Sequence, residues 1–277
     1  MQEKKKLLPV IITMTGGVKR GGPPEHYAAF FAHHGYATLA LAFFGVKGME
    51  KSYKDSPIRI EYFEEAVELL RAHESIDSDR VGVIGLSKAG DLALSMMQHL
   101  PQVKAVCYVN GSIATVETPT TYQGHTTPDL PSNLSRVTFQ DESTVNISQF
   151  YDSVCDHPQC IVRFEESGAD LLMVVGSKDL SWNGEEMADV AEFILKQSPK
   201  QNYKIIRYPE LGHFVELPNF PISGYDNHPL VPRSIKLYMG EGGKDDGTAS
   251  KEISKVWKDV LDFFDHSFGH NCNDKRR

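Results

Sequence analysis

Short apolar runs rich in β-branched residues alternate along the chain with segments of helical periodicity, and this alternation constrains the fold more than any other feature. The runs that predict strands are Leu8–Met14, Tyr36–Phe43, Val81–Gly85, Val103–Val109, Leu171–Val175 and Tyr203–Tyr208. They are almost continuously hydrophobic, as are parallel strands that are covered on both faces. The segments that predict helices are residues 25–33, 59–73, 89–100, 185–197 and 249–268. Such repetition implies right-handed crossovers and an α/β fold with a mostly parallel central sheet and helices on both faces.

One segment interrupts the alternation. Residues 112–168 are polar and rich in Thr, Ser and Pro, and they are too many for a plain connection between a strand and a helix. A segment of this kind is typical of a functional insertion or lid. Because 277 residues suit one large α/β unit, we expect a single domain over 1–277 with an insertion at about 112–168.

Charge and cysteine content limit the classes of partner. The 29 basic and 37 acidic residues give a formal charge of −8, which argues against nucleic acid as a partner. The apolar run Leu7–Met14 is too short for a membrane span. The four cysteines complete no His/Cys zinc pattern, so neither a metal nor another cofactor is expected. Free thiols favour an intracellular location, cytoplasmic by default, with peroxisome and mitochondrion left open. Oligomeric state is not predicted.

The strongest chemical signal is the segment Gly85-Leu86-Ser87-Lys88-Ala89, which lies between a predicted strand and a predicted buried helix. A serine at such a turn, flanked by small residues, is typical of a nucleophile elbow. The turn is so sharp that large side chains two positions before or after the serine would collide with backbone. Ala89 stands where the strict G-x-S-x-G pattern has glycine. Taken alone, the segment also fits a serine that caps the following helix.

Two residues further along the chain complete a triad. Asp179 follows the predicted strand Leu171–Val175, and His213 lies in a loop past Tyr203–Tyr208. The order Ser…Asp…His is that of the α/β-hydrolase fold. All three residues fall at carboxyl ends of predicted parallel strands, where such sheets bind ligands. We therefore predict Ser87 as nucleophile, His213 as general base and Asp179 as the acid that orients it.

A triad of this type needs donors for the oxyanion of the tetrahedral intermediate. The backbone N–H of Lys88, at the start of the helix, is one predicted donor. The other is expected in the loop after the first strand, at Thr15 or Gly16. Trp182, close behind Asp179, is interpreted as a packing residue.

Several segments together resemble one known family. They are Tyr36–Phe44, Glu61–Ala66, Gly85–Lys88, Leu94–Met96, Asn110–Ser112, Gly176–Asp179 with Trp182, and Tyr208–Pro218. The chain resembles the C-terminal catalytic domain of the type I acyl-CoA thioesterases and bile acid-CoA:amino acid N-acyltransferases over nearly all of its length. The resemblance implies an α/β-hydrolase fold and an acyl-CoA substrate, and it places the family's triad on Ser87, Asp179 and His213. Candidates to hold the CoA phosphates are Lys88, Arg163, Lys178, Arg233 and Lys236.

The same resemblance bears on the reaction. The principal amino-acid acyltransferase of the family has Cys at the elbow, so Ser87 favours hydrolysis of acyl-CoA to free fatty acid and CoA. Three alternatives stay open: an acyl-CoA:amino acid N-acyltransferase, a carboxylesterase or dienelactone-hydrolase-like enzyme, and an inactive acyl-binding remnant. The family's β-sandwich domain is not found in this sequence. Residues 1–7 cannot supply the first strands of the family's sheet, so these strands are expected to be missing.

Overall fold

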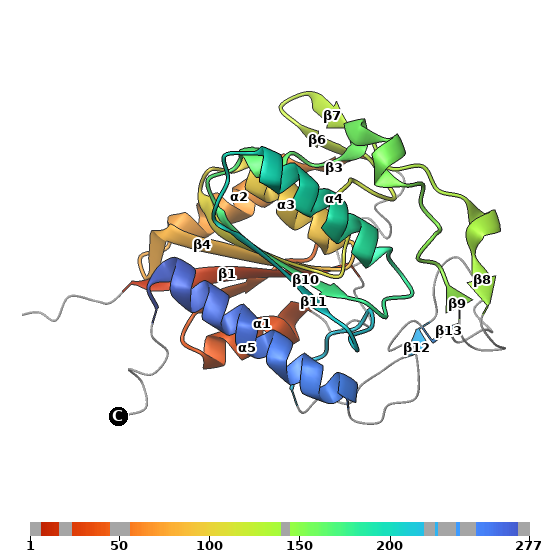
Figure 1. Cartoon of the computed structure of the whole chain (residues 1–277). Helices are drawn as coiled ribbons and strands as arrows, with labels where there is room; N and C mark the ends of the chain where they lie inside the picture. The colour runs from red at the N-terminus through yellow and green to blue at the C-terminus, as the bar shows by residue number, and fades with distance from the viewer. Residues whose placement is uncertain are drawn as a thin grey trace, which may run out of the picture.

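The core of the computed structural model is a six-stranded sheet in the order β11-β10-β5-β4-β1-β2 (Figure 1). The structure describes residues 7–16, 24–44, 56–139, 145–218, 225–226, 237–238 and 248–270. The strands are β1 (Leu8–Thr15), β2 (Ala37–Ala40), β4 (Ile76–Leu86), β5 (Val103–Val109), β10 (Asp170–Gly176) and β11 (Tyr203–Tyr208). Every neighbouring pair in this sheet is parallel. The predicted parallel α/β fold is therefore confirmed.

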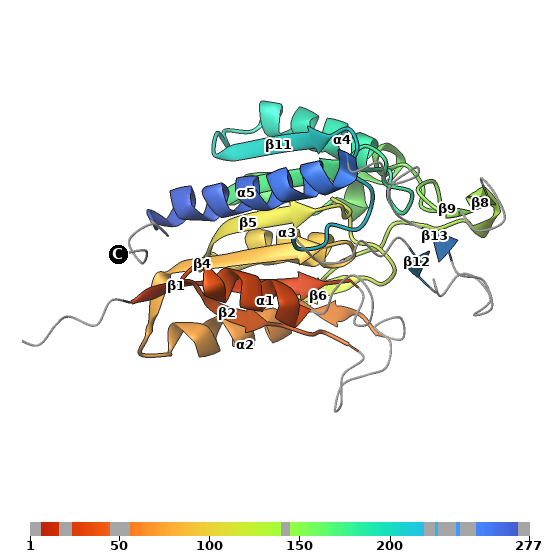
Figure 2. The ribbon, with the colours of Figure 1, turned by 90° about the horizontal axis from the view of Figure 1, so that it is seen from below.

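Helices cover both faces of the sheet. They are α1 (Pro24–His33), α2 (Ile60–Arg71), α3 (Ala89–His99), α4 (Gly184–Gln197) and α5 (Thr248–Phe268). Figure 2 shows α1 and α5 together on one face, and their side chains share a core with Ile11 of β1. The flanking Val10 and Ile12 instead join the core made by α2, α3 and α4. Successive strand residues thus alternate between two cores, which explains why the strands are apolar throughout.

Strand and helix ends differ from the predicted ones where tertiary contacts intervene. The apolar run Tyr36–Phe43 yields only the four residues of β2, because Phe43 leaves the sheet and packs near the ring of Phe63. Helix α2 begins one residue later than predicted, since the preceding Ile58–Arg59 forms strand β3, which pairs with β6 (Thr120–Tyr122). At the end of β2 and at the start of α2, the apolar pattern indicates that the residues are buried. It does not show whether they pair with a strand or pack against other side chains.

The order of the strands fixes where a ligand can bind. From β1 the chain moves outward to β2 and then returns to the other side of β1 as β4. The carboxyl ends of β1 and β4 therefore flank the topological switch point, which is the usual ligand crevice in an open parallel sheet. Among the residues that the structure describes, no strand pairs with the outer side of β2.

The described part of residues 112–168, that is 112–139 and 145–168, lies toward the carboxyl end of the sheet (Figure 1). Besides β6, the segment contains β7 (His125–Thr127), β8 (Thr138–Phe139), β9 (Val145–Asn146) and the 3₁₀ turns Leu134–Arg136, Val154–Asp156, Pro158–Cys160 and Phe164–Glu166. The backbone N–H of Ile147 donates to the carbonyl of Leu180 at 2.8 Å, in the loop after β10. Ile147 also belongs to a small apolar cluster that contacts Phe214, in the loop after β11. The insertion therefore packs on two of the loops that carry predicted site residues, and its role as a lid stays a prediction.

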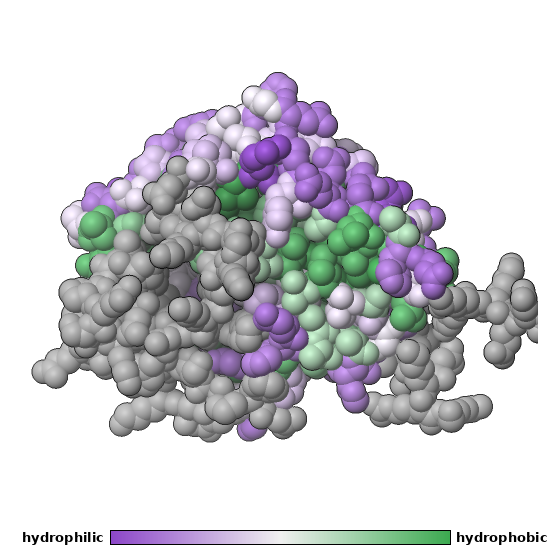
Figure 3. All heavy atoms as spheres, turned by 180° about the vertical axis from the view of Figure 1, so that it is seen from behind, coloured by the Kyte–Doolittle hydropathy of each residue, from purple (hydrophilic) through white to green (hydrophobic). Residues whose placement is uncertain are grey.

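The side of the molecule on which β2 forms the sheet edge faces the viewer in Figure 3, and apolar surface is visible there between hydrophilic regions. All four residues of β2 are partly exposed. The remaining short strands, β12 (Tyr225–Asp226) and β13 (Leu237–Tyr238), pair antiparallel with each other. None of the helices in the described ranges is long and apolar enough to cross a membrane. Within the same ranges, no three His, Cys, Asp or Glu side chains gather as a metal site.

Candidate active site

Ser87 lies at the turn between β4 and α3, in a backbone conformation that few residues other than glycine adopt. Its φ is +58°, in the left-handed region where a side chain strains the backbone. Two backbone hydrogen bonds hold the turn: the N–H of Ser87 donates to the carbonyl of Val109 at 3.0 Å, and its carbonyl accepts from Gly90 at 2.8 Å. Ser87 is partly exposed although its neighbours Leu86 and Lys88 are buried. The strained turn thus presents one hydroxyl at the end of the sheet.

The residues two positions before and after Ser87 are small because the backbone segments of the turn lie very close together. A Cβ at Gly85 would lie 2.1 Å from the carbonyl oxygen of Ala89, far inside van der Waals contact. Ala89 itself is fully buried against the core. Glycine is therefore necessary two positions before the serine, whereas a single methyl group fits two positions after it. This accounts for the departure from the strict glycine pattern.

The structure brings the three predicted triad residues together. His213 Nε2 lies 3.0 Å from Ser87 Oγ, and His213 Nδ1 lies 3.0 Å from Asp179 Oδ2. Asp179 and His213 are each only 8% exposed. The three side chains form one continuous hydrogen-bonded chain from a buried carboxylate to a partly exposed hydroxyl, which is the arrangement that nucleophilic acyl transfer requires.

Asp179 is held in place by backbone donors of its own loop. Its Oδ1 accepts the N–H of Ser181 at 2.7 Å and the N–H of Trp182 at 3.1 Å. An ionised carboxylate accepts hydrogen bonds only, so its other oxygen takes the Nδ1–H of His213. That proton on Nδ1 leaves the lone pair of Nε2 facing Ser87, the state of imidazole that accepts a proton from the hydroxyl.

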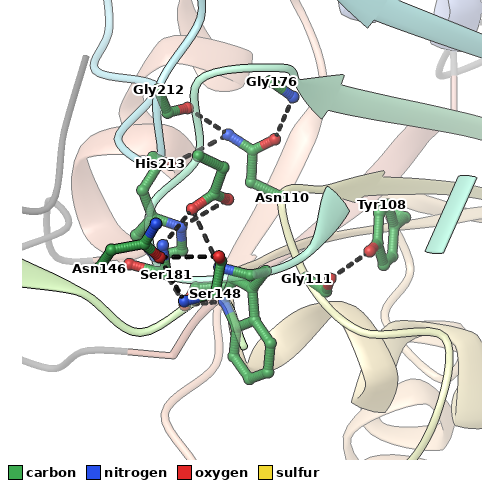
Figure 4. A network of polar contacts seen from close by, with 12 residues as sticks. Tyr108, Asn110, Gly111, Asn146, Ser148, Gly176, Ser181, Gly212 and His213 are labelled. Carbon is green, nitrogen blue, oxygen red and sulfur yellow. Dashed lines mark hydrogen bonds and ion pairs between the residues drawn. The ribbon is translucent and has the colours of Figure 1, made fainter. Parts of the chain in front are cut away.

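Asn110 connects the loops that carry Asp179 and His213, and Figure 4 shows its bonds to Gly176 and Gly212. It follows β5, is 2% exposed and has a φ of +43°. Its Oδ1 accepts the N–H of Gly176 at 2.7 Å, while its Nδ2 donates to the carbonyls of Gly212 at 2.7 Å and His213 at 3.1 Å. The sequence interpretation assigned no role to Asn110. The available signal was an Asn-Gly pair at the carboxyl end of a central strand, where backbone loops converge.

Trp182 does more than pack. Its indole Nε1–H donates to Ser87 Oγ over 3.4 Å, and its ring is stacked on Tyr151 of the insertion, with 5.3 Å between centroids and 7° between planes. Trp182 is 7% exposed. The packing interpretation therefore missed a direct contact with Ser87, because a sequence does not reveal which way an indole points.

Lys88, one of the candidates to hold the CoA phosphates, has a buried side chain. Its Nζ forms an ion pair with Asp91 Oδ2 at 2.6 Å, and neither side chain is more than 3% exposed. Burial raises the pKa of Asp91 to about 6, although the ammonium of Lys88 and the N–H of Val116 oppose the rise. Because its charge is buried in this pair, Lys88 is not positioned to meet CoA phosphates.

Two of the other candidates for phosphate binding form ion pairs with glutamate side chains, and two are not described by the structure. Arg163 forms an ion pair with Glu166 at 2.5 Å, and Lys178 forms one with Glu210. Arg233 and Lys236 lie outside the described residues. The structure therefore singles out no residue as a phosphate contact.

The end of β1 lies directly against the backbone of Lys88. A Cβ on Gly16 would be 2.6 Å from the amide nitrogen of Lys88, so any side chain there would crowd the predicted oxyanion donor. The N–H of Gly16 donates to the carbonyl of Leu86 at 3.0 Å and is thereby engaged in the sheet. Thr15, buried beside Gly16, is the remaining candidate in this loop. The oxyanion roles of Lys88 and Thr15 stay predictions.

Comparison with solved structures concerns the fold. The chain is similar to a dienelactone hydrolase from Klebsiella pneumoniae, with a TM-score of 0.57, 15% identity, and coverage of 95% of this chain and 89% of that one. A puromycin-hydrolysing peptidase from Mycobacterium tuberculosis gives a TM-score of 0.59 at 14% identity, covering 97% of this chain and 35% of that one. At such low identity, these matches support the α/β-hydrolase fold and nothing about the substrate.

Comparison with curated sequences gives nearer relatives. The chain is 32% identical over 265 residues to human acyl-coenzyme A thioesterase 1, covering 95% of this chain and 61% of that protein. It is also 32% identical to human acyl-coenzyme A thioesterase 2, mitochondrial, covering 95% of this chain and 53% of that one. The chain thus spans little more than half the length of these relatives. Residues 58–270 match the family model described as BAAT / Acyl-CoA thioester hydrolase C terminal, and the chain belongs to this family.

Proposed function

We propose that this chain hydrolyses acyl-CoA thioesters to free fatty acid and CoA, with Ser87 as nucleophile, His213 as general acid–base and Asp179 as the orienting carboxylate. The observation that carries the proposal is the pair of 3.0 Å contacts that link Asp179 to His213 and His213 to Ser87. Membership in a family whose relatives are named acyl-CoA thioesterases supplies the substrate class.

Acylation begins with attack of Ser87 Oγ on the thioester carbonyl, while His213 Nε2 takes the hydroxyl proton. Negative charge moves to the carbonyl oxygen, where the backbone N–H groups of Lys88 and Thr15 are the proposed donors. The carbon–sulfur bond then breaks, and His213 gives its proton to the departing thiolate. CoA leaves as the thiol and the acyl group remains esterified to Ser87.

Deacylation repeats these steps with water. His213 takes a proton from water as the water oxygen attacks the ester carbonyl, and the bond to Ser87 Oγ breaks as His213 returns the proton to it. The products are a fatty acid and the free enzyme, so atoms and charge balance over the cycle. The carboxylate of Asp179 stabilises the imidazolium that forms in each half-reaction without itself taking the proton.

The direct test is release of CoA thiol from a panel of acyl-CoAs of increasing chain length, measured with a thiol-reactive dye. Ser87→Ala is expected to lower kcat by roughly 10³-fold or more, since the nucleophile is absent. Ser135→Ala is the matched control, because Ser135 is exposed on a 3₁₀ turn of the insertion. Equal turnover by wild type and Ser87→Ala would refute the proposal.

The same assay separates the competing reactions. Adding glycine or taurine is expected to leave fatty acid as the product; formation of an amide would reassign the chain to amino-acid acyl transfer. Simple carboxylesters are expected to react more slowly than CoA thioesters, and the reverse preference would favour a carboxylesterase. A serine-directed phosphonate is expected to label Ser87, and failure to label folded protein would favour a non-catalytic acyl-binding role.

A further inference from the structure

Ser87 Oγ has two polar neighbours, and together they determine how the hydroxyl is oriented. His213 Nε2 lies at 3.0 Å and the indole Nε1 of Trp182 at 3.4 Å. A hydroxyl has one hydrogen to donate and two lone pairs. With Nε2 acting as base, the hydrogen points to His213. An indole N–H can only donate, so Trp182 occupies one lone pair and leaves a single lone pair for attack.

We propose that Trp182 is a positioning residue for the nucleophile, fixing the direction of the attacking lone pair of Ser87, and that Tyr151 of the insertion holds its indole in place. This inference rests on the proposed role of Ser87 as the residue that becomes acylated. It assigns to the insertion a part in the chemistry, in addition to any part in covering the substrate.

The indole is held from several sides. Its ring is stacked on Tyr151, and the hydroxyl of Tyr151 is hydrogen-bonded to the half-buried carboxyl of Glu117. The backbone of Tyr151 forms an isolated antiparallel bridge with Ser132. The backbone N–H of Trp182 donates to Asp179 Oδ1 at 3.1 Å. One residue thus contacts both ends of the triad, and a ring from the insertion limits rotation of its side chain.

The N–H of Trp182 matters most when charge is present on Ser87 Oγ. In deacylation the bond between the acyl carbon and Oγ breaks, and negative charge accumulates on this oxygen before His213 protonates it. A donor already aimed at Oγ strengthens its hydrogen bond at that moment, so it stabilises the transition state more than the bound substrate. Loss of the donor should therefore reduce kcat and leave KM nearly unchanged.

Trp182→Phe keeps an aromatic ring for the stack and removes only the N–H. We expect kcat for acyl-CoA to fall roughly 3- to 10-fold, the range for one hydrogen bond of ordinary strength, with KM within about twofold of wild type. The rate of phosphonate labelling at Ser87 should fall as well. Tyr151→Leu, which removes the stacked ring and leaves the indole, should give a smaller fall in kcat in the same direction.

Trp257→Phe is the matched control. The indole of Trp257 also donates one hydrogen bond, to the carbonyl of Glu216 at 2.7 Å, but its ring packs against Tyr27 and Phe30 of α1, on the face of the sheet that α1 and α5 cover. Its loss reproduces the general effect of removing an indole donor on stability. We expect it to leave kcat and labelling at wild-type values.

Three results would overturn the inference: wild-type kcat and labelling in folded Trp182→Phe, a change confined to KM, or equal losses in Trp182→Phe and Trp257→Phe. Failure of the proposed function gives a different result. If wild-type protein is labelled at Ser87 yet releases no CoA, the thioesterase assignment fails, while the labelling rates of the two variants still decide the role of Trp182.

Discussion

The side chain of Asn110 donates to the carbonyl of Gly212, 102 positions later in the chain, at 2.7 Å. The same amide accepts the N–H of Gly176 at 2.7 Å. Asn110, which directly follows the central strand β5, therefore holds the loops of Asp179 and His213 in their common position.

Asn110→Asp tests whether Asn110 clamps these two loops together, because aspartate has almost the same shape as asparagine. A carboxylate can still accept from Gly176, but it cannot donate to Gly212 and would repel that carbonyl. We expect the free energy of unfolding to fall by about 1–3 kcal/mol and kcat to fall while KM holds. Chemical denaturation and steady-state kinetics measure the two effects. Asn110→Gly, which suits the φ of +43°, should show the same loss of kcat; full activity in both variants would exclude the clamp.

Gly85 and Ala89 form a second testable pair. A methyl group at Gly85 would lie 2.1 Å from the carbonyl of Ala89, so Gly85→Ala must displace the turn that presents Ser87. We expect a loss of at least about 2 kcal/mol in stability, as for an overpacked core, and a large loss of activity. Ala89→Gly should cost only about 1 kcal/mol, the usual penalty for glycine in a helix. Thermal unfolding of both variants measures these losses. If Gly85→Ala were as stable as wild type, the steric explanation of the elbow would be wrong.

Glu117 should make stability depend on pH. Burial raises its pKa from 4.5 to about 7, although its bond to Tyr151 opposes the rise. The folded protein therefore binds a proton between these pH values that the unfolded chain does not. This contribution to stability is full below about pH 4.5 and is lost as pH rises through about 7.

Glu117→Gln removes this titration while keeping a side chain of the same shape that can bond to Tyr151. The variant should be more stable than wild type by on the order of 2 kcal/mol at about pH 8 and equal to it near pH 4.5. Denaturant unfolding across this range measures the difference. Parallel stability curves for the two proteins would show that Glu117 keeps an ordinary pKa when folded.

The buried pair of Lys88 and Asp91 gives a second prediction of how stability changes with pH. Lys88→Met retains the apolar stem and removes the ammonium that faces Asp91 at 2.6 Å. An unpaired buried carboxylate costs about 3–5 kcal/mol, and the loss of Lys88 should raise the pKa of Asp91 above its value of about 6. The destabilisation should therefore be largest near pH 8 and shrink toward pH 5, where Asp91 is protonated. A penalty independent of pH would point to lost packing alone.

The central sheet was predictable because its strands are buried on both faces. Val103–Val109 and Tyr203–Tyr208 match β5 and β11 residue for residue, since in each case the apolar run and the paired segment coincide. The triad geometry followed from topology, because parallel strands bring their carboxyl ends to one edge. Where β2 ends and where α2 begins depended instead on contacts with distant residues.

The strand pairing of the insertion and the roles of Asn110 and Trp182 were not predictable from hydrophobic pattern. Strand β3 pairs with β6, although Ile58 and Thr120 are far apart in sequence, and neither segment has a periodicity that reveals a partner. Asn110 and Trp182 act through the direction of a single side-chain amide or N–H group. The hydrophobic pattern carries no information on the direction of a side chain. The sequence therefore indicated the candidate triad residues more readily than the residues that hold them in place.

Ser87 and His213 are separated by 126 positions, and the loop of His213 follows β11, the outermost strand on its side of the sheet. Because synthesis runs from the N-terminus, the segment that forms the turn at Ser87 is made well before the imidazole of His213. A chain truncated before β11 would keep Ser87 but lack His213, so its serine hydroxyl would have no imidazole beside it. Any reaction that depends on this pair therefore requires the whole sheet, out to its β11 edge.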